Sequence, residues 1–256
     1  MIKSWMESLL IALSMYSALP VKCLNWTEKN LRNAMVFFPL VGLLCGVGLF
    51  VVWTVCELLH VGAVLFGVLA VLSGILITGG IHLDGYADTC DALSSYGDRE
   101  KKLEILKDPH CGAFAVIRLC SYFAAYLALC ACVQFTPQAG LLWMMALVLE
   151  RALSGYAVAA FPMAKNTGLA HTFASAADRA TVRRVLTLLA AVLCCAMLAL
   201  GGWALVLAAL AVPWRYHAVA CKQFGGITGD LAGWFLQKTE IWMLAALCAC
   251  QWGGLL

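Results

Sequence analysis

The sequence carries little charge. Only 12% of its 256 residues are Asp, Glu, Lys or Arg, whereas 63% are hydrophobic and the mean hydropathy is +0.89. A soluble domain has about 25% charged and about 45–50% apolar residues. This shortage of charge excludes an ordinary soluble fold, because only a bilayer can solvate so much apolar surface. The net charge of +3, with no basic block interleaved with aromatics, also excludes nucleic acid as a partner.

The cysteine spacing of a metal or redox site is missing as well. The chain has thirteen cysteines but no Cys-x-x-Cys pair, and most of them lie inside apolar runs. Cysteine behaves there as a small hydrophobe, so we interpret these residues as packing residues rather than metal ligands or disulfides. Cys90 and Cys111 are the two that lie near the polar motif described below.

Charge-free runs predict a single all-α integral membrane domain over residues 1–256, a polytopic helix bundle of about seven transmembrane helices. Each run approaches the roughly 20 residues that cross the hydrocarbon core. Six or eight spans are alternatives. Residues 1–20 have no clean small-x-small cleavage site and predict a retained amphipathic or interfacial helix. The predicted spans are 35–59, 61–80, 113–135, 139–161, two spans divided at Gly201-Gly202 within 185–214, and 234–252.

The basic residues predict the orientation of these spans. All seventeen Lys and Arg fall within 3–32, 99–118, 151–184 and 215–238, and the turns at 60, 136–138 and 201–202 contain none. The positive-inside rule therefore predicts a multi-pass membrane protein with the N-terminus and the site-forming loops in the cytoplasm and the C-terminus outside. Only Glu57 of the fourteen acidic residues lies near an outer turn, so we expect the functional surface on the inner face.

Three aspartates follow the second span at helical spacing. Asp84, Asp88 and Asp91 lie at i, i+4 and i+7, so a helix points all three carboxylates the same way. Like charges on one helix face repel, which folding alone would not favour. Carboxylate oxygens are Mg²⁺ ligands, and Mg²⁺ commonly bridges one or two carboxylates to substrate phosphates. We therefore predict that the three aspartates bind Mg²⁺; the alternative is an acidic solvated helix face.

Polar residues near the aspartates predict a phosphate site. Gly79, Gly80 and Gly85 would let the backbone approach a ligand, and nearby cations suit phosphate charge, although these cations also satisfy the positive-inside bias. A second polar segment, 222–230, has the glycines and the threonine of a phosphate-cradling loop. The predicted substrate-binding residues of these two segments are Arg99, Lys102, Lys107, Lys222, Gly225, Gly226, Thr228 and Asp230.

Two further positions have a functional and a structural interpretation. His82 either contacts the reacting groups, and is then catalytic together with the three aspartates, or hydrogen-bonds at the membrane boundary. Glu150-Arg151 falls near the middle of a predicted span, where charge costs roughly 2.5 kcal/mol or more. Arg151 is therefore a candidate phosphate ligand, and an ion pair that joins helices is the alternative.

These motifs resemble the adenosylcobinamide-GDP ribazoletransferase (cobalamin synthase) family. The likeness rests on F-P-L-V-G, on G-G-I-H-L-D-G-Y-A-D-T-C-D, on R-E-K-K-L-E-I-L-K-D with the following Gly112, and on G-G-I-T-G-D, in this order over nearly the whole chain. Ala92, where the family usually has Gly, and Gln237, where many members have an acid, are departures.

The resemblance implies a Mg²⁺-dependent transferase of the bacterial cytoplasmic (inner) membrane that joins adenosylcobinamide-GDP to α-ribazole, or to its 5′-phosphate, and releases GMP. It implies that the aspartates hold Mg²⁺ against the diphosphate while an aspartate not fully engaged by metal, such as Asp91, accepts the proton of the attacking ribose hydroxyl. The implied partners are the two substrates, the lipid bilayer and neighbouring cobalamin-assembly enzymes.

Three other functions fit the sequence less well. CDP-alcohol phosphotransferases carry D-x-x-D-G-x-x-A-R and a downstream acidic pair, whereas Asp84-Gly85 is followed by Tyr-Ala-Asp. Membrane prenyltransferases use two aspartate-rich motifs, and the second segment here has only Asp230. A cation-coupled transporter would place its acids near the midplane and often shows inverted repeats, which this chain lacks.

Overall fold

The protein is an assembly of helices. The computed structural model describes residues 2–21 and 25–256. Lys22, one of the basic residues within 3–32, therefore lies outside the described residues. Within those ranges the strand-like structure is limited to an isolated parallel bridge between Met163 and Ile227. The predicted all-α class is therefore confirmed.

The elements are α1 (Ile2–Tyr16), α2 (Glu28–Leu31), the 3₁₀ turn η1 (Ala34–Phe37), α3 (Phe38–Leu58), α4 (Ala63–Thr78), α5 (Ile81–Ser94), α6 (Arg99–Ile105), α7 (Ala113–Cys132), α8 (Pro137–Ala160), α9 (Leu169–Ala176), α10 (Arg179–Ala199), α11 (Trp203–Val219), the π-helical turn η2 (Ala220–Phe224) and α12 (Gly229–Trp252).

Long apolar helices make this a multi-pass membrane protein. They expose large hydrophobic side chains such as Phe50, Val116 and Leu188, which a bilayer would cover. Five segments of the described chain are long and apolar enough to cross a membrane: Glu28–Leu58, Ala113–Cys132, Pro137–Ala160, Arg179–Ala199 and Trp203–Phe224.

The predicted count of seven spans is not confirmed, because the described chain offers five, or six if α4 and α5 form one broken span. α4 has only 16 residues and meets α5 at a bend of 99°. α12 carries Asp230, Lys238 and Glu240 and is largely buried, so it is the central helix of the bundle rather than an apolar outer one. The predicted break at Gly201-Gly202 is confirmed between α10 and α11, with Gly201 at φ 77°.

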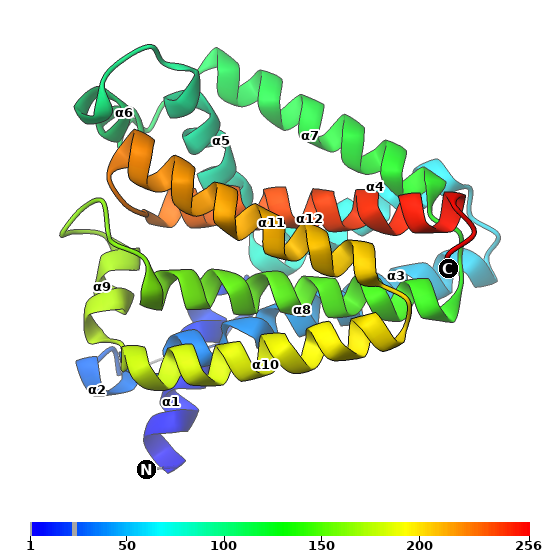
Figure 1. The fold of residues 1–256 in the computed structure, drawn as a ribbon, viewed down its shortest axis with the longest axis horizontal. Helices are drawn as coiled ribbons and strands as arrows, with labels where there is room; N and C mark the ends of the chain where they lie inside the picture. The colour runs from blue at the N-terminus through cyan, green and yellow to red at the C-terminus, as the bar shows by residue number, and fades with distance from the viewer. Residues whose placement is uncertain (1, 22–24) are drawn as a thin grey trace.

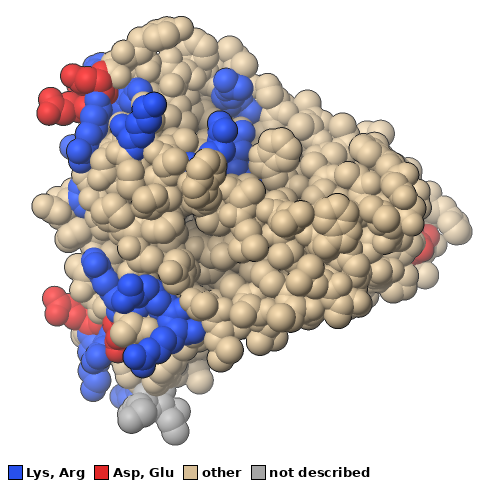
Figure 2. Space-filling model, viewed as in Figure 1, with Lys and Arg blue, Asp and Glu red and all other residues tan. Residues whose placement is uncertain are grey.

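Charged residues gather at one end of the bundle. Figure 1 shows α2, α6 and α9 at the left, and the connections α3–α4, α7–α8 and α10–α11 at the right. Figure 2 shows most visible Lys, Arg, Asp and Glu toward the left, and a wide uncharged surface elsewhere. The C-terminus lies at the opposite end, where Leu255 and Leu256 lie beside Gly201. This is the separation that the charge pattern predicts.

A pair of glycines turns the chain from α4 into α5. Gly79 and Gly80 both have left-handed backbone, at φ 67° and 78°. Side chains with a Cβ rarely adopt this region, whereas glycine does so at no steric cost. The two consecutive residues end α4 and start α5 in a new direction, which directs the aspartate helix across the charged end of the bundle.

Candidate active site

The three aspartates lie on one helix, as their spacing predicts. Asp84, Asp88 and Asp91 all belong to α5. Asp84 is exposed, and Asp88 and Asp91 are partly buried. The negative charges of Asp84, Asp91 and the distant Asp230 all act on Asp88. The carboxylates therefore form one electrostatic cluster that draws on two helices.

Close packing of α5 on α12 brings Asp230 to this cluster. A Cβ at Gly85 would lie 2.8 Å from the carbonyl oxygen of Asp230, and one at Gly233 would lie 2.7 Å from the carbonyl oxygen of His82. Only residues without a side chain allow two helix backbones to approach so closely. The crossing thus joins the two polar segments that the sequence separates.

A cavity of about 440 Å³ opens beside this crossing, and we call it the aspartate cavity. Its polar lining comes from α5, from the loop after α6, from the loop after α8 and from the start of α12. Apolar residues of α1, η1 and α3, among them Tyr16, Met35 and Phe38, close another side. The polar side chains on its wall include His82, Asp84, Lys107, Lys165, Thr228 and Asp230.

Two lysines place positive charge opposite the carboxylates. Burial lowers the pKa of Lys165, while the neighbouring Asp230 acts in the opposite direction and Lys107 reinforces the lowering. Thr228 is the N-cap of α12: its hydroxyl oxygen accepts from the Leu231 amide at 3.2 Å, and the hydroxyl donates to Asp230 Oδ2 at 3.2 Å. Because a helix N-terminus favours anions, this corner suits a phosphate as well as a cation.

His82 is held by aromatic rings on the cavity wall. The residue is 6% exposed, and its ring lies 6.4 Å from that of Tyr16 and 5.7 Å from that of Phe38. Within the described residues its Nε2 has no hydrogen-bond partner. A buried imidazole nitrogen without a partner is costly, so a ligand group in the cavity would be its natural partner.

Asp91 lies against a different element. One of its carboxylate oxygens accepts from the Ala115 amide at 3.4 Å, and a Cβ at Gly112, the N-cap of α7, would overlap the carboxylate. The carboxylate therefore stabilises the positive end of α7. Of the three predicted metal ligands, Asp91 is the one with a structural role that explains its position.

The carboxylates fit a metal that is shared with substrate. No three His, Cys, Asp or Glu side chains converge on one point in the part of the chain that the structure describes. Mg²⁺ keeps several waters and usually takes one or two carboxylates together with phosphate oxygens. Asp84 and Asp230 line the aspartate cavity and can supply one or two such ligands without a complete protein cage, and their charges also act on Asp88, which lies outside the cavity lining.

The glycine-rich loop is fixed by protein contacts rather than open to a ligand. The amides of Gly225, Gly226 and Ile227 donate to the carbonyls of Cys221, Ala220 and Pro162. These bonds use the amides that would cradle a phosphate. They also tie the loop to the chain that carries Lys165, and so position that lysine.

The predicted cations divide between the cavity and its surroundings. Lys107 lines the cavity. The Arg99 guanidinium lies against Gly225, and Lys102 Nζ donates to Gln223 Oε1 at 2.5 Å, so both join α6 to η2. Lys222 is exposed. Lys165, which the sequence analysis did not select, takes the position beside Asp230 because the isolated bridge at Met163 draws its loop to α12.

Arg151 lies in the core, away from the aspartate cavity. It is 3% exposed, pairs with the fully buried Glu150, and donates to the Leu147 carbonyl at 2.9 Å. It also contacts Cys45 Sγ at 3.5 Å, on α3. The alternative interpretation, an ion pair that joins helices, is met only in part: Glu150 and Arg151 pair within α8, and the contact with a second helix is the one from Arg151 to Cys45.

Comparison with known proteins is consistent with these motifs. The chain is 42% identical over 243 residues to an adenosylcobinamide-GDP ribazoletransferase of Lachnoclostridium phytofermentans, a match that covers 93% of this chain and 91% of that protein. Proteins of the same name from Pseudomonas fluorescens and Clostridium botulinum are 37% and 31% identical, over 90% and 96% of this chain and 94% and 98% of theirs. No solved structure matches. A sequence model of one family, described as cobalamin-5-phosphate synthase, matches residues 8–248, and the chain therefore belongs to that family.

Proposed function

We propose that this protein is an adenosylcobinamide-GDP ribazoletransferase, which joins adenosylcobinamide-GDP to α-ribazole or its 5′-phosphate and releases GMP. The names of its relatives support the reaction. The observation that carries the site assignment is the aspartate cavity, where Asp84 and Asp230 face Lys107 and Lys165 around one space. Carboxylates beside cations are what a metal-bound diphosphate requires.

In this proposal the diphosphate of adenosylcobinamide-GDP lies between the carboxylates and the lysines of the aspartate cavity. Lys107 and Lys165 bind its oxygens, and the N-terminal turn of α12 at Thr228 adds a favourable dipole. Asp84, Asp88 and Asp230 would hold Mg²⁺, and the bound ion would neutralise negative charge on the reacting and departing phosphates. The lysines thereby orient the substrate, and their positive charge stabilises the departing GMP.

The bond changes follow from a phosphoryl-type transfer. The ribose hydroxyl of α-ribazole attacks the phosphorus attached to cobinamide, the P–O bond to GMP breaks, and the hydroxyl loses its proton. A carboxylate of the cluster that is not fully engaged by the metal would accept this proton. His82 lines the cavity with an Nε2 that has no protein partner within the described chain, which makes it our candidate to hydrogen-bond the reacting groups. Asp91 is already engaged at the start of α7, so we assign it the positioning of that helix instead.

We propose that the charged end of the bundle faces the cytoplasm and that the protein resides in the bacterial inner membrane. The distribution of Lys and Arg supports this orientation through the positive-inside rule. Adenosylcobinamide-GDP is anionic at its reacting diphosphate, and α-ribazole reacts through a polar ribose hydroxyl, which suits a site that opens at this end. Contact with other cobalamin-assembly enzymes stays a prediction.

The test is release of GMP by the purified, detergent-solubilised protein. We expect release that requires adenosylcobinamide-GDP, the α-ribazole acceptor and Mg²⁺ together. The variant Glu104→Gln should keep this activity and is the control for changes at the aspartates. Glu104 is an exposed acid at the same end of the bundle, and it pairs with Lys101 outside the cavity. GMP release that is independent of acceptor would indicate a hydrolase, and its absence under all conditions would contradict the proposal.

A further inference from the structure

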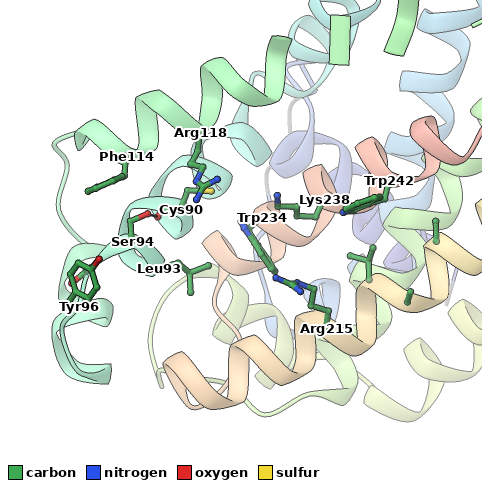
Figure 3. A pocket seen from close by; sticks show the side chains of 14 residues that line it. Cys90, Leu93, Ser94, Tyr96, Phe114, Arg118, Arg215, Trp234, Lys238 and Trp242 are labelled. Carbon is green, nitrogen blue, oxygen red and sulfur yellow. Dashed lines mark hydrogen bonds between the residues drawn. The ribbon is translucent and has the colours of Figure 1, made fainter. Parts of the chain in front are cut away.

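A second, larger cavity lies on the other face of α12. It measures about 860 Å³ and is enclosed by α5, α7, α11 and α12. Figure 3 shows Arg118 from α7, Arg215 from α11 and Lys238 from α12 around it, with Trp234 and Trp242 on its wall. We call it the basic cavity. None of the residues that line it also lines the aspartate cavity, so it is a second space to which no step of the proposed reaction is assigned.

The three cations of the basic cavity lack a counter-charge. Among the residues that the structure describes, none of Arg118, Arg215 and Lys238 forms an ion pair. The positive charges of Arg118 and Arg215 both act on the half-buried Lys238. Lys238 Nζ lies 5.7 Å from the centre of the Tyr86 ring, and this cation–π contact compensates the lysine charge only in part. Three cations that repel one another around a cavity favour an anion inside it.

The walls of the basic cavity are apolar and continue onto a lipid-facing surface. Phe114 of α7 is 53% exposed and Trp242 of α12 is 58% exposed. Ile117, one residue before Arg118, and Leu210, on α11, are similarly exposed, and both belong to segments that can cross a membrane. The opening between α7 and α11 therefore faces the surface that acyl chains cover. Tryptophan beside basic residues is typical of the membrane interface.

We propose that the basic cavity binds the headgroup of an anionic phospholipid. The phosphate would lie among Arg118, Arg215 and Lys238, and the acyl chains would leave between α7 and α11 along their exposed apolar side chains. A soluble phosphate would neutralise the cations but would leave these apolar walls uncovered. A zwitterionic lipid would cover the walls but would bring no net negative charge. An anionic lipid satisfies both.

The proposal is tested by titrating the detergent-purified full chain with short-chain dioctanoyl phosphatidylglycerol while its thermal unfolding midpoint is measured. We expect the midpoint to rise with phosphatidylglycerol and to change little with dioctanoyl phosphatidylcholine. Each cation removed should weaken apparent affinity by roughly fivefold, which corresponds to about 1 kcal/mol. The variant Arg118→Gln/Arg215→Gln should therefore lose most of the shift. If the double variant does not fold, Arg215→Gln alone replaces it in the test. Arg215 is exposed, so its substitution should leave folding intact.

The control removes the same charge elsewhere. Arg183→Gln/Arg184→Gln lies on exposed positions of α10, outside the basic cavity, and should keep the full shift. An equal loss in this control would show a general surface-charge effect and overturn the proposal. An equal shift with a soluble phosphate monoester, ribose 5-phosphate, at the same concentration would show a soluble ligand instead and would also overturn it. Failure of GMP release does not bear on these outcomes, since the readout requires no activity.

Discussion

Gly85 of α5 lies against the backbone of Asp230 of α12, so that a Cβ at Gly85 would come within 2.8 Å of the Asp230 carbonyl oxygen. Asp84 precedes Gly85 in the chain, and the same contact therefore places Asp84 and Asp230 on one cavity. The distance between the two helices sets the distance between the two carboxylates. The proposed active site consequently depends on a contact between two backbones.

Gly85→Ala is expected to lower both stability and activity. The added methyl would force α5 and α12 apart, and overpacking of this kind costs about 1–3 kcal/mol. Unfolding in a denaturing detergent, followed alongside GMP release, measures the two effects. Gly74→Ala in α4 is the control, because a Cβ there meets nothing within 4 Å. Equal stability of the two variants would show that the crossing tolerates a side chain.

Asp84→Asn is expected to lower turnover, whereas Asp91→Asn is expected to lower stability. Asp84→Asn should lower kcat by ~100-fold or more, which is about 2.7 kcal/mol of transition-state stabilisation, while insertion stays normal. Asp91→Asn should instead destabilise the protein by about 0.5–2 kcal/mol, since its carboxylate stabilises the start of α7. Comparing kcat with the unfolding midpoint of each variant separates the two roles. Loss of turnover in Asp91→Asn with unchanged stability would return Asp91 to the catalytic set.

Lys165 is expected to set the alkaline limit of activity. Burial lowers its pKa below the ordinary lysine value, so its positive charge is lost at a lower pH than that of an exposed lysine. kcat/KM should therefore fall on the alkaline side as Lys165 deprotonates. Lys165→Arg should move this fall to higher pH, because arginine stays protonated. Lys165→Gln should lower kcat/KM by roughly 10–100-fold at neutral pH, the value of a charge-assisted hydrogen bond. An unchanged pH profile in Lys165→Arg would remove the lysine from the site.

Arg151→Met is expected to act on stability alone. Glu150 is fully buried, and removal of its partner leaves a charge without compensation, which typically costs about 3–5 kcal/mol. Glu150→Gln/Arg151→Met should recover part of that loss, because it removes the Glu150–Arg151 pair but leaves Glu240, whose negative charge also acts on Arg151. The KM for adenosylcobinamide-GDP of the folded fraction should stay near the wild-type value. A raised KM with unchanged stability would instead support the phosphate-binding role predicted from sequence.

Local patterns in the sequence predict the helices well. The spacing of Asp84, Asp88 and Asp91 predicts one helix, and α5 contains all three. The glycines at 201 and 202 predict a break that the structure has. These features depend on residues within a few turns of one another, and short-range sterics decide them.

Contacts between distant segments could not be predicted in the same way. The approach of Gly85 to Asp230 and the placement of Lys165 depend on how α5, α12 and a loop pack together. The engagement of Asp91 with α7 likewise depends on tertiary structure. The predicted count of seven spans is not confirmed for a related reason: α12 has the length of a span but carries charged residues and is buried among other helices.

Metal binding by the aspartates is tested most directly by electron paramagnetic resonance of the purified protein, with Mn²⁺ in place of Mg²⁺ and with a non-hydrolysable nucleoside diphosphate present. We expect one bound ion per chain in the wild type and in Glu104→Gln, and a large loss of binding in both Asp84→Asn and Asp88→Asn. Full binding in these two aspartate variants would contradict the assignment of the metal to the carboxylates of α5 and α12.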